Sequence, residues 1–195
     1  NPHFLYNALS SISVLAMGNG DKVASRAILY LSDFYRITLS KGKQDITIRE
    51  ELNLLESYLK IQRMRFDDSI EVEYELDESL LDVHVVKLTL QPIVENAIHH
   101  GRDDDSEVFH ILIRLFEEQG KTVFEVIDDG CGMDPEKLMQ LQNSMNHSEG
   151  GYGLRNVNIR IKLQYGSQYG VYIESERGFG TKIRIEFPGR ERAKA

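Results

Sequence analysis

The sequence predicts an α+β protein in which a helical region, residues 1–67, precedes an α/β domain, residues 68–189. Apolar residues recur at heptad-like spacing through the first third of the chain, which is typical of packed amphipathic helices. From residue 70 apolar residues alternate with acidic ones, which is typical of a strand with one buried face. Three glycine-rich segments follow, each beside an expected strand or helix.

Three helices are expected in the first region, over residues 3–17, 22–40 and 47–65. Each carries one apolar stripe: Leu5, Ala8, Ile12 and Leu15 in the first, Ala27, Leu31 and Phe34 in the second, and Ile48, Leu52, Leu55 and Leu59 in the third. Thr47 and Glu50 form a capping-box pattern at the start of the third helix. Because one small sheet cannot cover three such stripes, we expect a homodimer through these helices.

The second region is expected to contain five strands and three helices. The strands are expected over residues 70–76, 107–117, 121–128, 169–176 and 180–187. The helices are expected over residues 84–100, 135–143 and 153–165, the first of them mostly buried.

The composition is that of an ordinary soluble globular protein, with 195 residues, 41% of them hydrophobic and 28% charged. A formal net charge of -8 argues against binding nucleic acid or an anionic membrane over a broad surface. The single cysteine, Cys131, excludes an internal disulfide and suits a reducing cytoplasm. No apolar run is long enough to span a bilayer. Because the chain begins at Asn1 rather than Met, we expect it to be part of a longer protein, with any membrane anchor upstream.

Two polar residues in apolar surroundings are candidates for a ligand site. Asn96 lies in an expected buried helix, where an unpaired amide is costly. Its oxygen suits Mg²⁺, which shares its ligands with phosphates; a local polar network is the other interpretation. Asp128 ends an expected strand and precedes Gly130 and Gly132, which let a ligand approach the backbone closely. Its carboxylate can accept a hydrogen bond from the amine of adenine, or it lies in a solvated acidic turn.

Two further glycine-rich segments lie close to expected helix and strand starts. Residues 150–153 come directly before a helix, where free N–H groups and the positive end of the helix dipole favour an anion. Arg155, Asn156 and Arg160 of that helix are candidate phosphate partners, and a surface ion pair is the other interpretation of Arg160. Residues 178–181 predict a hairpin turn that could also border the same pocket.

The order and spacing of these segments resemble the N, G1, G2 and G3 boxes of the gyrase/histidine-kinase/MutL ATPase superfamily, over about residues 68–187. The resemblance implies the Bergerat fold, an α/β sandwich with a mixed sheet that binds ATP and Mg²⁺ beneath a lid at residues 133–152. It implies that Asn96 ligates the magnesium and that Asp128 binds the adenine amine. His99, favoured over His100, has the place of a basic residue that faces the phosphates in related kinases. The other implied nucleotide-binding residues are Gly130, Gly132, Gly151, Gly153, Leu154 and Thr181.

Residues 1–7, Asn-Pro-His-Phe-Leu-Tyr-Asn, resemble the phosphoacceptor signature of the LytS/YesM-like sensor histidine kinases. Residues 58–66 and residues 90–92 resemble further signatures of that family. The resemblance implies that His3 is autophosphorylated from ATP and passes the phosphoryl group to an aspartate of a response regulator. It also implies a cytoplasmic part of a bacterial membrane sensor that is a homodimer in its full-length form.

Two positions depart from the patterns of related proteins. Phe4 replaces the acid that follows the phosphoacceptor in many histidine kinases, so Glu95 is a candidate base, with a structural role as the alternative. Pro92 replaces the glutamate that activates water in gyrase-like and MutL-like enzymes, which argues against the alternative of an ATP-hydrolysing clamp. A dimerisation module with a degenerate pocket is a further alternative, opposed by the presence of Asn96, Asp128 and the glycines.

Overall fold

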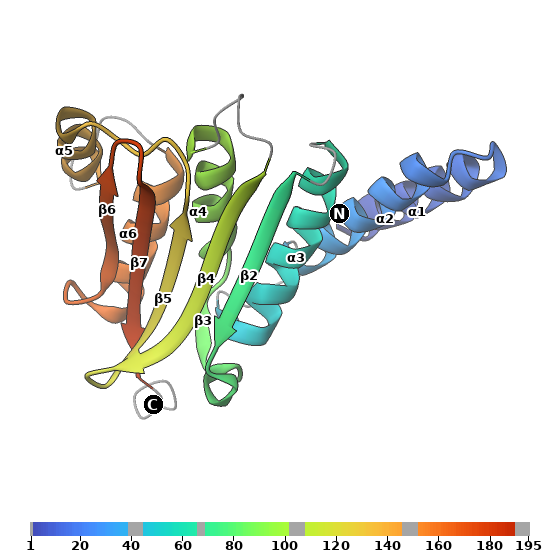
Figure 1. Cartoon of the computed structure of the whole chain (residues 1–195). Helices are drawn as coiled ribbons and strands as arrows, with labels where there is room; N and C mark the ends of the chain where they lie inside the picture. The colour runs from blue at the N-terminus through green and yellow to red at the C-terminus, as the bar shows by residue number, and fades with distance from the viewer. Residues whose placement is uncertain (1, 39–44, 66–68, 102–107, 146–151, 190–195) are drawn as a thin grey trace.

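The computed structural model describes residues 2–38, 45–65, 69–101, 108–145 and 152–189, with side chains for all of these but 2–4, 37, 65 and 152. A long helical hairpin extends from one side of an α/β sandwich (Figure 1). The expected α+β organisation with a mixed sheet is confirmed. No helix among these described residues is long and apolar enough to cross a lipid bilayer.

The hairpin consists of α1 (Pro2–Gly18) and α2 (Lys22–Thr38), as the heptad stripes predict. The two helices run antiparallel, because the Tyr6 hydroxyl near the start of α1 donates to the carbonyl of Tyr35 near the end of α2 at 3.2 Å. Ser13 and Ser25 are both buried between the helices, and the Ser13 hydroxyl donates to the Ser25 carbonyl at 3.1 Å. The start of α1 therefore lies beside the end of α2, and Figure 1 shows this end of the hairpin nearer the sandwich.

The third helix, α3 (Ile48–Arg65), begins with the expected capping box. The Glu50 N–H donates to Thr47 Oγ1 at 3.2 Å, and the Thr47 N–H donates to Glu50 Oε2 at 2.9 Å. The helix buries Ile48, Leu55 and Leu59 in the same core as the sheet. Since this core is continuous across the expected boundary between residues 67 and 68, that boundary stays a prediction.

The five-stranded sheet has the order β2-β4-β5-β7-β6. Its strands are β2 (Ile70–Leu76), β4 (Phe109–Glu118), β5 (Lys121–Asp128), β6 (Gly170–Glu176) and β7 (Gly180–Pro188), close to the expected ranges. β2 pairs parallel with β4, and all other pairs are antiparallel.

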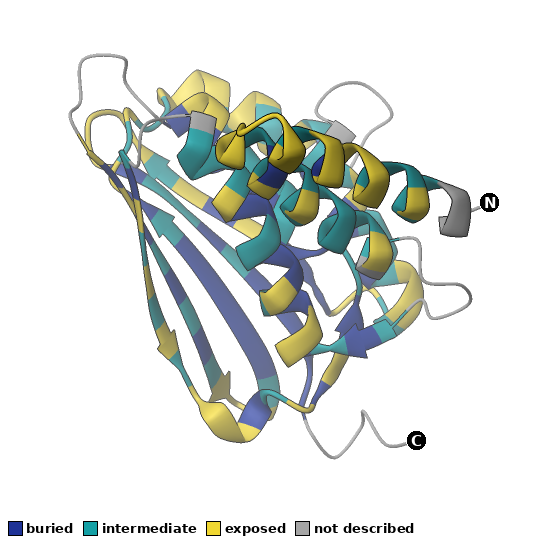
Figure 2. Ribbon diagram, turned by 90° about the vertical axis from the view of Figure 1, so that its right-hand side faces the viewer, coloured by how far each residue is buried: buried dark blue, intermediate teal, exposed yellow. Residues whose placement is uncertain are grey.

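One face of the sheet is covered by helices, and Figure 1 looks onto the other face. The covering helices are α4 (Leu90–Asn96), its π-helical continuation η2 (Ala97–Gly101) and α6 (Tyr152–Tyr165). α5 (Pro135–Ser144) packs beside β6, and the short 3₁₀ helix η1 (Glu78–Leu80) follows β2. α6 buries Leu154, Val157 and Ile161, which recur at helical spacing. Figure 2 shows buried residues along the central strands and exposed ones along the hairpin.

The prediction of a single helix over residues 84–100 was wrong at its beginning. Residues 84–86 form β3 (His84–Val86), which pairs antiparallel with β1 (Asp45–Thr47). A turn follows at residues 87–89, with Leu88 at φ +59°, and α4 begins only at Leu90. Each strand has three residues, and its partner lies about forty positions away, so local periodicity could not show the pairing.

Candidate active site

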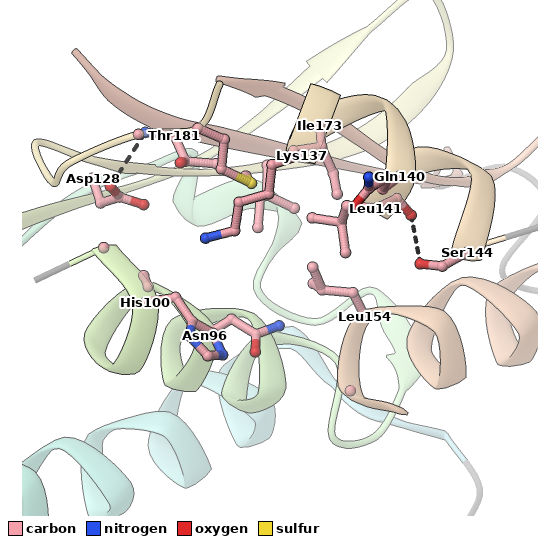
Figure 3. Close-up of a pocket in the computed structure, with 16 residues that line it drawn as sticks. Asn96, His100, Asp128, Lys137, Gln140, Leu141, Ser144, Leu154, Ile173 and Thr181 are labelled. Carbon is pink, nitrogen blue, oxygen red and sulfur yellow. Dashed lines mark hydrogen bonds between the residues drawn. The ribbon is translucent and has the colours of Figure 1, made fainter. Parts of the chain in front are cut away.

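A cavity of about 610 Å³ lies between α4, η2, α5 and the start of α6 (Figure 3). Six of the residues expected in the site line it: Asn96, Asp128, Gly132, Gly153, Leu154 and Thr181. These residues come from four separate segments of the chain. The fold therefore brings together the four motifs that the sequence places up to 85 positions apart.

Asp128 lies at the end of β5 and is 5% exposed. Its Oδ1 accepts hydrogen bonds from the backbone N–H of Gly130 at 3.0 Å and of Thr181 at 3.2 Å. Burial raises the pKa of this carboxyl group from 3.8 to about 6, although the two backbone donors act in the opposite direction. Because both donors bind Oδ1, Oδ2 is the oxygen that can accept a hydrogen bond from a ligand.

Two glycines near Asp128 lie against neighbouring backbone, and Gly132 of the two lines the cavity. Gly180 has φ +87°, and a Cβ atom there would lie 1.9 Å from the Asp128 carbonyl oxygen. Gly132 has φ +62°, and its Cβ atom would lie 1.9 Å from the carbonyl oxygen of Glu176. Only glycine fits either position without displacing the backbone. Gly153 differs from both, since the nearest atoms to its Cβ would be Asn96 Nδ2 and Pro92 Cβ at 3.7 Å.

Asn96 is the last residue of α4, and its half-buried side chain lies at the cavity (Figure 3). His100 also lines the cavity, whereas His99, the histidine favoured from the sequence, is exposed and outside the lining. The π-helical turn explains the difference. Its i→i+5 bonding makes it wider than an α-helical turn, so the residue four positions after Asn96, rather than three, follows it on the same face.

The other expected site residues are placed differently. Glu95 is half-buried and accepts a hydrogen bond from Gln91 Nε2 at 3.3 Å, and it does not line the cavity. Gly130 contributes its N–H to Asp128 rather than a surface to the lining. Gly151 lies outside the described residues. The backbone of His3 belongs to the first turn of α1, and its side chain lies outside the described part of the structure.

One face of α5 lines the cavity, which the sequence did not predict. Lys137, Gln140, Leu141 and Ser144 recur at helical spacing and all border the cavity. The Lys137 side chain extends into the cavity (Figure 3), and it is the one permanent cation in the described lining. The spacing of these four residues was the available signal. They were missed because the segment was assigned to the lid as a whole.

The residues present fit a magnesium ion that is held jointly with a nucleotide. Among the described residues there is no group of three or more His, Cys, Asp or Glu side chains that could hold a metal ion. Asn96 offers one amide oxygen at the cavity. Mg²⁺ commonly binds one or two protein oxygens and takes its remaining ligands from phosphates and water. A metal held by protein ligands alone does not fit these residues.

Comparison with known proteins shows which family the chain belongs to. The family model described as Histidine kinase matches residues 1–70, and the one described as Histidine kinase-, DNA gyrase B-, and HSP90-like ATPase matches residues 81–191. Sensor histidine kinase YesM of Bacillus subtilis is 36% identical over 190 residues, which cover 97% of this chain and 32% of that protein. Sensor protein LytS of Bacillus cereus is 35% identical over 191 residues, covering 96% and 32%.

The chain thus spans about a third of the length of these curated relatives. Among solved structures, the histidine kinase domain of the Erythrobacter litoralis EL346 blue-light activated histidine kinase is similar, with a TM-score of 0.55 and 20% identity. The similarity covers 96% of this chain and 85% of that one. At this identity the comparison shows a shared fold.

Proposed function

Because this chain belongs to the family of histidine kinase-, DNA gyrase B- and HSP90-like ATPases, we propose that its cavity binds ATP and that His3 receives the γ-phosphoryl group. The observation that carries the proposal is the buried Asp128 carboxylate, fixed at the cavity by the N–H groups of Gly130 and Thr181. A carboxylate held in this way accepts a hydrogen bond from the exocyclic amine of adenine through Oδ2.

The remaining lining orients the triphosphate. The start of α6 presents free backbone N–H groups and the positive end of the helix dipole to an anion, beside Gly153 and Leu154. Asn96 lies next to Gly153 and would hold magnesium with the phosphates. A magnesium ion held there would neutralise charge that develops on the transferred group. Lys137 and His100 add donors from the facing elements.

Transfer to His3 requires the start of α1 to reach the nucleotide. A neutral imidazole nitrogen attacks the γ-phosphorus atom, the bond to the β,γ-bridging oxygen breaks, and ADP leaves. The start of α1 lies beside the end of α2, and the Thr38 carbonyl there accepts a hydrogen bond from Lys87 Nζ of the sandwich at 3.0 Å. This end of the hairpin is therefore the one nearer the sandwich. The phosphoryl group then passes to an aspartate of a response regulator.

Hydrolysis is the competing activity of proteins with related cavities. Pro92 is on α4 one turn before Asn96, and a proline side chain cannot activate water. Glu95 does not line the cavity, so it gives no support to a water-activating role. We therefore propose phosphoryl transfer rather than ATP hydrolysis as the main activity.

The test uses ATP labelled on its γ-phosphate with the wild type, His3→Gln and Asn96→Ala. We expect acid-labile label on the wild type and none on either variant. His3→Gln should still bind a non-hydrolysable ATP analogue with wild-type affinity, whereas Asn96→Ala should bind it more weakly in the presence of Mg²⁺. Label that persists on His3→Gln, or rapid release of free phosphate by this variant, would contradict the proposal.

A further inference from the structure

The turn between β3 and α4, together with the first residue of α4 (residues 87–90), is bound by residues of three helices. It connects a strand of the small sheet to the helix that carries Asn96, and its Leu88 has the unusual φ of +59°. Such a backbone conformation persists in a non-glycine residue only where the surroundings hold it in place. The contacts of this turn come from α2, α3 and α6.

Glu51 of α3 binds three consecutive backbone N–H groups of this turn. Its Oε2 accepts from Leu88 at 2.9 Å, and its Oε1 accepts from Thr89 at 2.6 Å and from Leu90 at 2.8 Å. The side chain is 1% exposed. Burial raises the pKa of this carboxyl group, and the three N–H donors and the charge of Arg160 oppose that shift. Glu51 thus caps α4 from a different helix.

Arg160 of α6 binds the carbonyl groups of the same turn. Its Nη1 donates to the Lys87 carbonyl at 2.7 Å, and its Nη2 donates to the Leu88 carbonyl at 2.6 Å. The N–H groups of the turn therefore donate to the Glu51 carboxylate, and the carbonyl groups of the turn accept from the Arg160 guanidinium group. The position of Arg160 on the turn, rather than on the surface or at the phosphates, corrects both interpretations made from the sequence.

A local side chain could have capped α4 at less cost. Thr89 is in the N-cap position, but its hydroxyl donates to the Val86 carbonyl and makes no cap hydrogen bond. The cap comes instead from a glutamate 37 to 39 positions earlier in the chain, at the cost of burying a carboxylate. What this arrangement adds over a local cap is a connection between helices.

We propose that Glu51 and Arg160 are positioning residues for the nucleotide site. They bind the turn from which α4 begins, and Asn96 lies six residues further along that helix, or about 9 Å. Arg160 belongs to α6, whose first turn carries Gly153 and Leu154 at the cavity. Lys87 extends the connection to the hairpin through its hydrogen bond to the Thr38 carbonyl. A displacement of α3 or of the hairpin thereby moves Asn96 relative to the phosphates.

The inference rests on the proposed binding of magnesium and ATP by Asn96, and the test separates the two. The affinity of Glu51→Gln for a non-hydrolysable ATP analogue is measured with Mg²⁺ and with a chelator, together with amide hydrogen exchange along α4. A glutamine cannot accept three N–H donors with both side-chain termini, so the turn loosens. We expect affinity with Mg²⁺ to fall about tenfold, as for other residues that orient a metal ligand. Affinity without Mg²⁺ should stay unchanged, and exchange within α4 should accelerate.

The matched control is Glu125→Gln, which alters another buried glutamate. Glu125 lies on β5, on the sheet face that carries no helix, and pairs with Arg114 and Arg184. Its replacement should lower stability without changing the effect of Mg²⁺ on affinity. If Glu51→Gln fails to fold, Arg160→Lys is measured in its place. This variant keeps the positive charge but lacks the bidentate donor, and we expect the same changes in affinity and exchange.

Three results would overturn the inference: wild-type affinity of a folded Glu51→Gln with Mg²⁺, an equal loss with and without Mg²⁺, or an equal loss in Glu125→Gln. If Arg160→Lys is used in place of Glu51→Gln, the same results for Arg160→Lys would also overturn the inference. A wild-type protein that binds no analogue at all contradicts the proposed function instead.

Discussion

At the scale of single residues, the proposed contact between Asp128 and adenine depends on the charge state of the Asp128 carboxyl group. The folded apo-protein holds a proton on Asp128 up to a pH of about 6, above the ordinary pKa of 3.8. This raised pKa means that burial of the ionised form costs stability. The contribution of Asp128 to stability is therefore fully present below pH 3.8 and is lost as the pH rises through about 6.

We expect nucleotide affinity to fall as the pH is lowered through about 6, because the protonated carboxyl group is a weaker acceptor for the adenine amine. Calorimetric titration across this range measures the effect. Asp128→Asn provides the control, since ATP itself titrates equally with both proteins. The variant should bind weakly at every pH, and it should lose less stability than the wild type as the pH rises. A parallel pH dependence in both proteins would be evidence against the role of Asp128.

We expect the glycines at and beside the cavity to have two roles, since Gly132 and Gly180 allow close backbone approach and Gly153 would leave room for the nucleotide. We expect Gly180→Ala to destabilise the protein by about 2 kcal/mol or more, because a Cβ atom 1.9 Å from a backbone oxygen at φ +87° forces the chain to move. Gly153→Ala should retain or slightly gain stability, since it lies in helix α6 and its Cβ atom would meet Asn96 and Pro92 at an ordinary van der Waals distance of 3.7 Å. It should nevertheless weaken nucleotide binding.

Urea unfolding and analogue binding, measured on both glycine variants, test this division. We expect Gly180→Ala to lose stability, and we expect Gly153→Ala to lose nucleotide affinity while its stability is retained. A Gly153→Ala protein with full affinity would mean that the phosphates do not approach this part of α6.

The residues that could be predicted from the sequence are those whose spacing along the chain carries the signal. Asn96 and Asp128 lie beside glycines or apolar residues in recognisable patterns, and the structure brings both to one cavity. Glu51 gave no such signal. Its partners are backbone N–H groups of a turn 37 positions away, so in the sequence it is one more acidic residue on an amphipathic helix. Long-range contacts to backbone leave no periodic trace.

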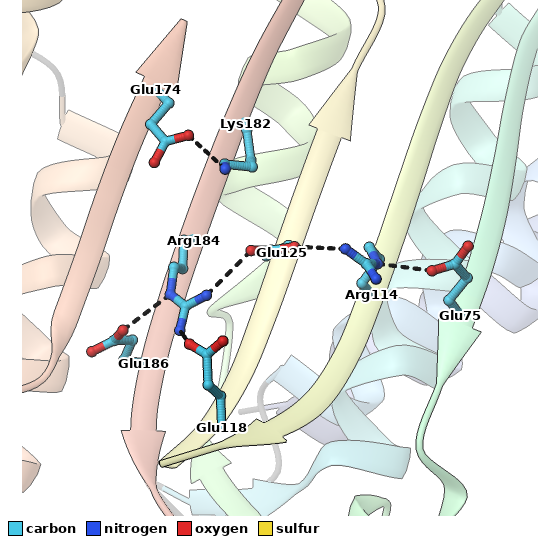
Figure 4. A network of polar contacts seen from close by, with 8 residues as sticks. All are labelled: Glu75, Arg114, Glu118, Glu125, Glu174, Lys182, Arg184 and Glu186. Carbon is cyan, nitrogen blue, oxygen red and sulfur yellow. Dashed lines mark hydrogen bonds and ion pairs between the residues drawn. The ribbon is translucent and has the colours of Figure 1, made fainter.

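At the scale of elements, the sheet face without helices is held by a ladder of ion pairs across four strands (Figure 4). Glu75 of β2 pairs with Arg114 of β4 at 2.8 Å, and Arg114 pairs with the buried Glu125 of β5 at 3.2 Å. Arg184 of β7 completes the ladder through Glu125 at 3.3 Å and Glu186 at 3.0 Å. The ladder thus crosses the strands in their order within the sheet.

We expect Arg184→Met to destabilise the protein by about 1–2 kcal/mol, because it leaves the buried Glu125 with one partner instead of two. Lys182→Met is the control on the same strand and face, since its partner Glu174 is 72% exposed, and such pairs contribute about 0–1 kcal/mol. Chemical denaturation measures both. Nucleotide affinity should be unchanged in either variant, because the cavity lies on the other face of the sheet. Equal destabilisation by the two substitutions would mean that the ladder acts as a set of independent surface pairs.

The elements that could be predicted are the ones with a strong local period. The heptad stripes predicted the three N-terminal helices, and alternation predicted β2. β1 and β3 were missed, because two strands of three residues are stable only as partners of each other and of the core beneath them. The π-helical turn after Asn96 was also missed, since no composition marks it, and with it the exchange of His99 for His100 at the cavity.

At the scale of the whole molecule, the hairpin carries large apolar side chains that the described part of the chain leaves exposed. Among the described residues, its large exposed apolar side chains lie on both helices: Ile12, Val14, Leu15, Met17, Val23 and Leu29. Val14 is 71% and Leu15 67% exposed. We infer from these exposed apolar side chains that the hairpin forms an interface with another protein surface. Of these six residues, only Ile12 and Leu15 belong to the apolar stripes that the heptad spacing predicted.

A second copy of the hairpin is the occupant that we expect, because two antiparallel pairs with apolar stripes form a four-helix bundle. Leu15→Glu should therefore convert the full-length protein from a dimer to a monomer in light scattering, since a charge would be buried at the centre of the bundle. Leu163→Glu is the matched control: Leu163 is 82% exposed on α6, away from the hairpin, and its replacement should leave the dimer intact. Both variants should bind nucleotide as the wild type does, because neither residue lines the cavity. A Leu15→Glu protein that remains dimeric would place the interface elsewhere, and equal dissociation by both variants would assign α6 to it as well.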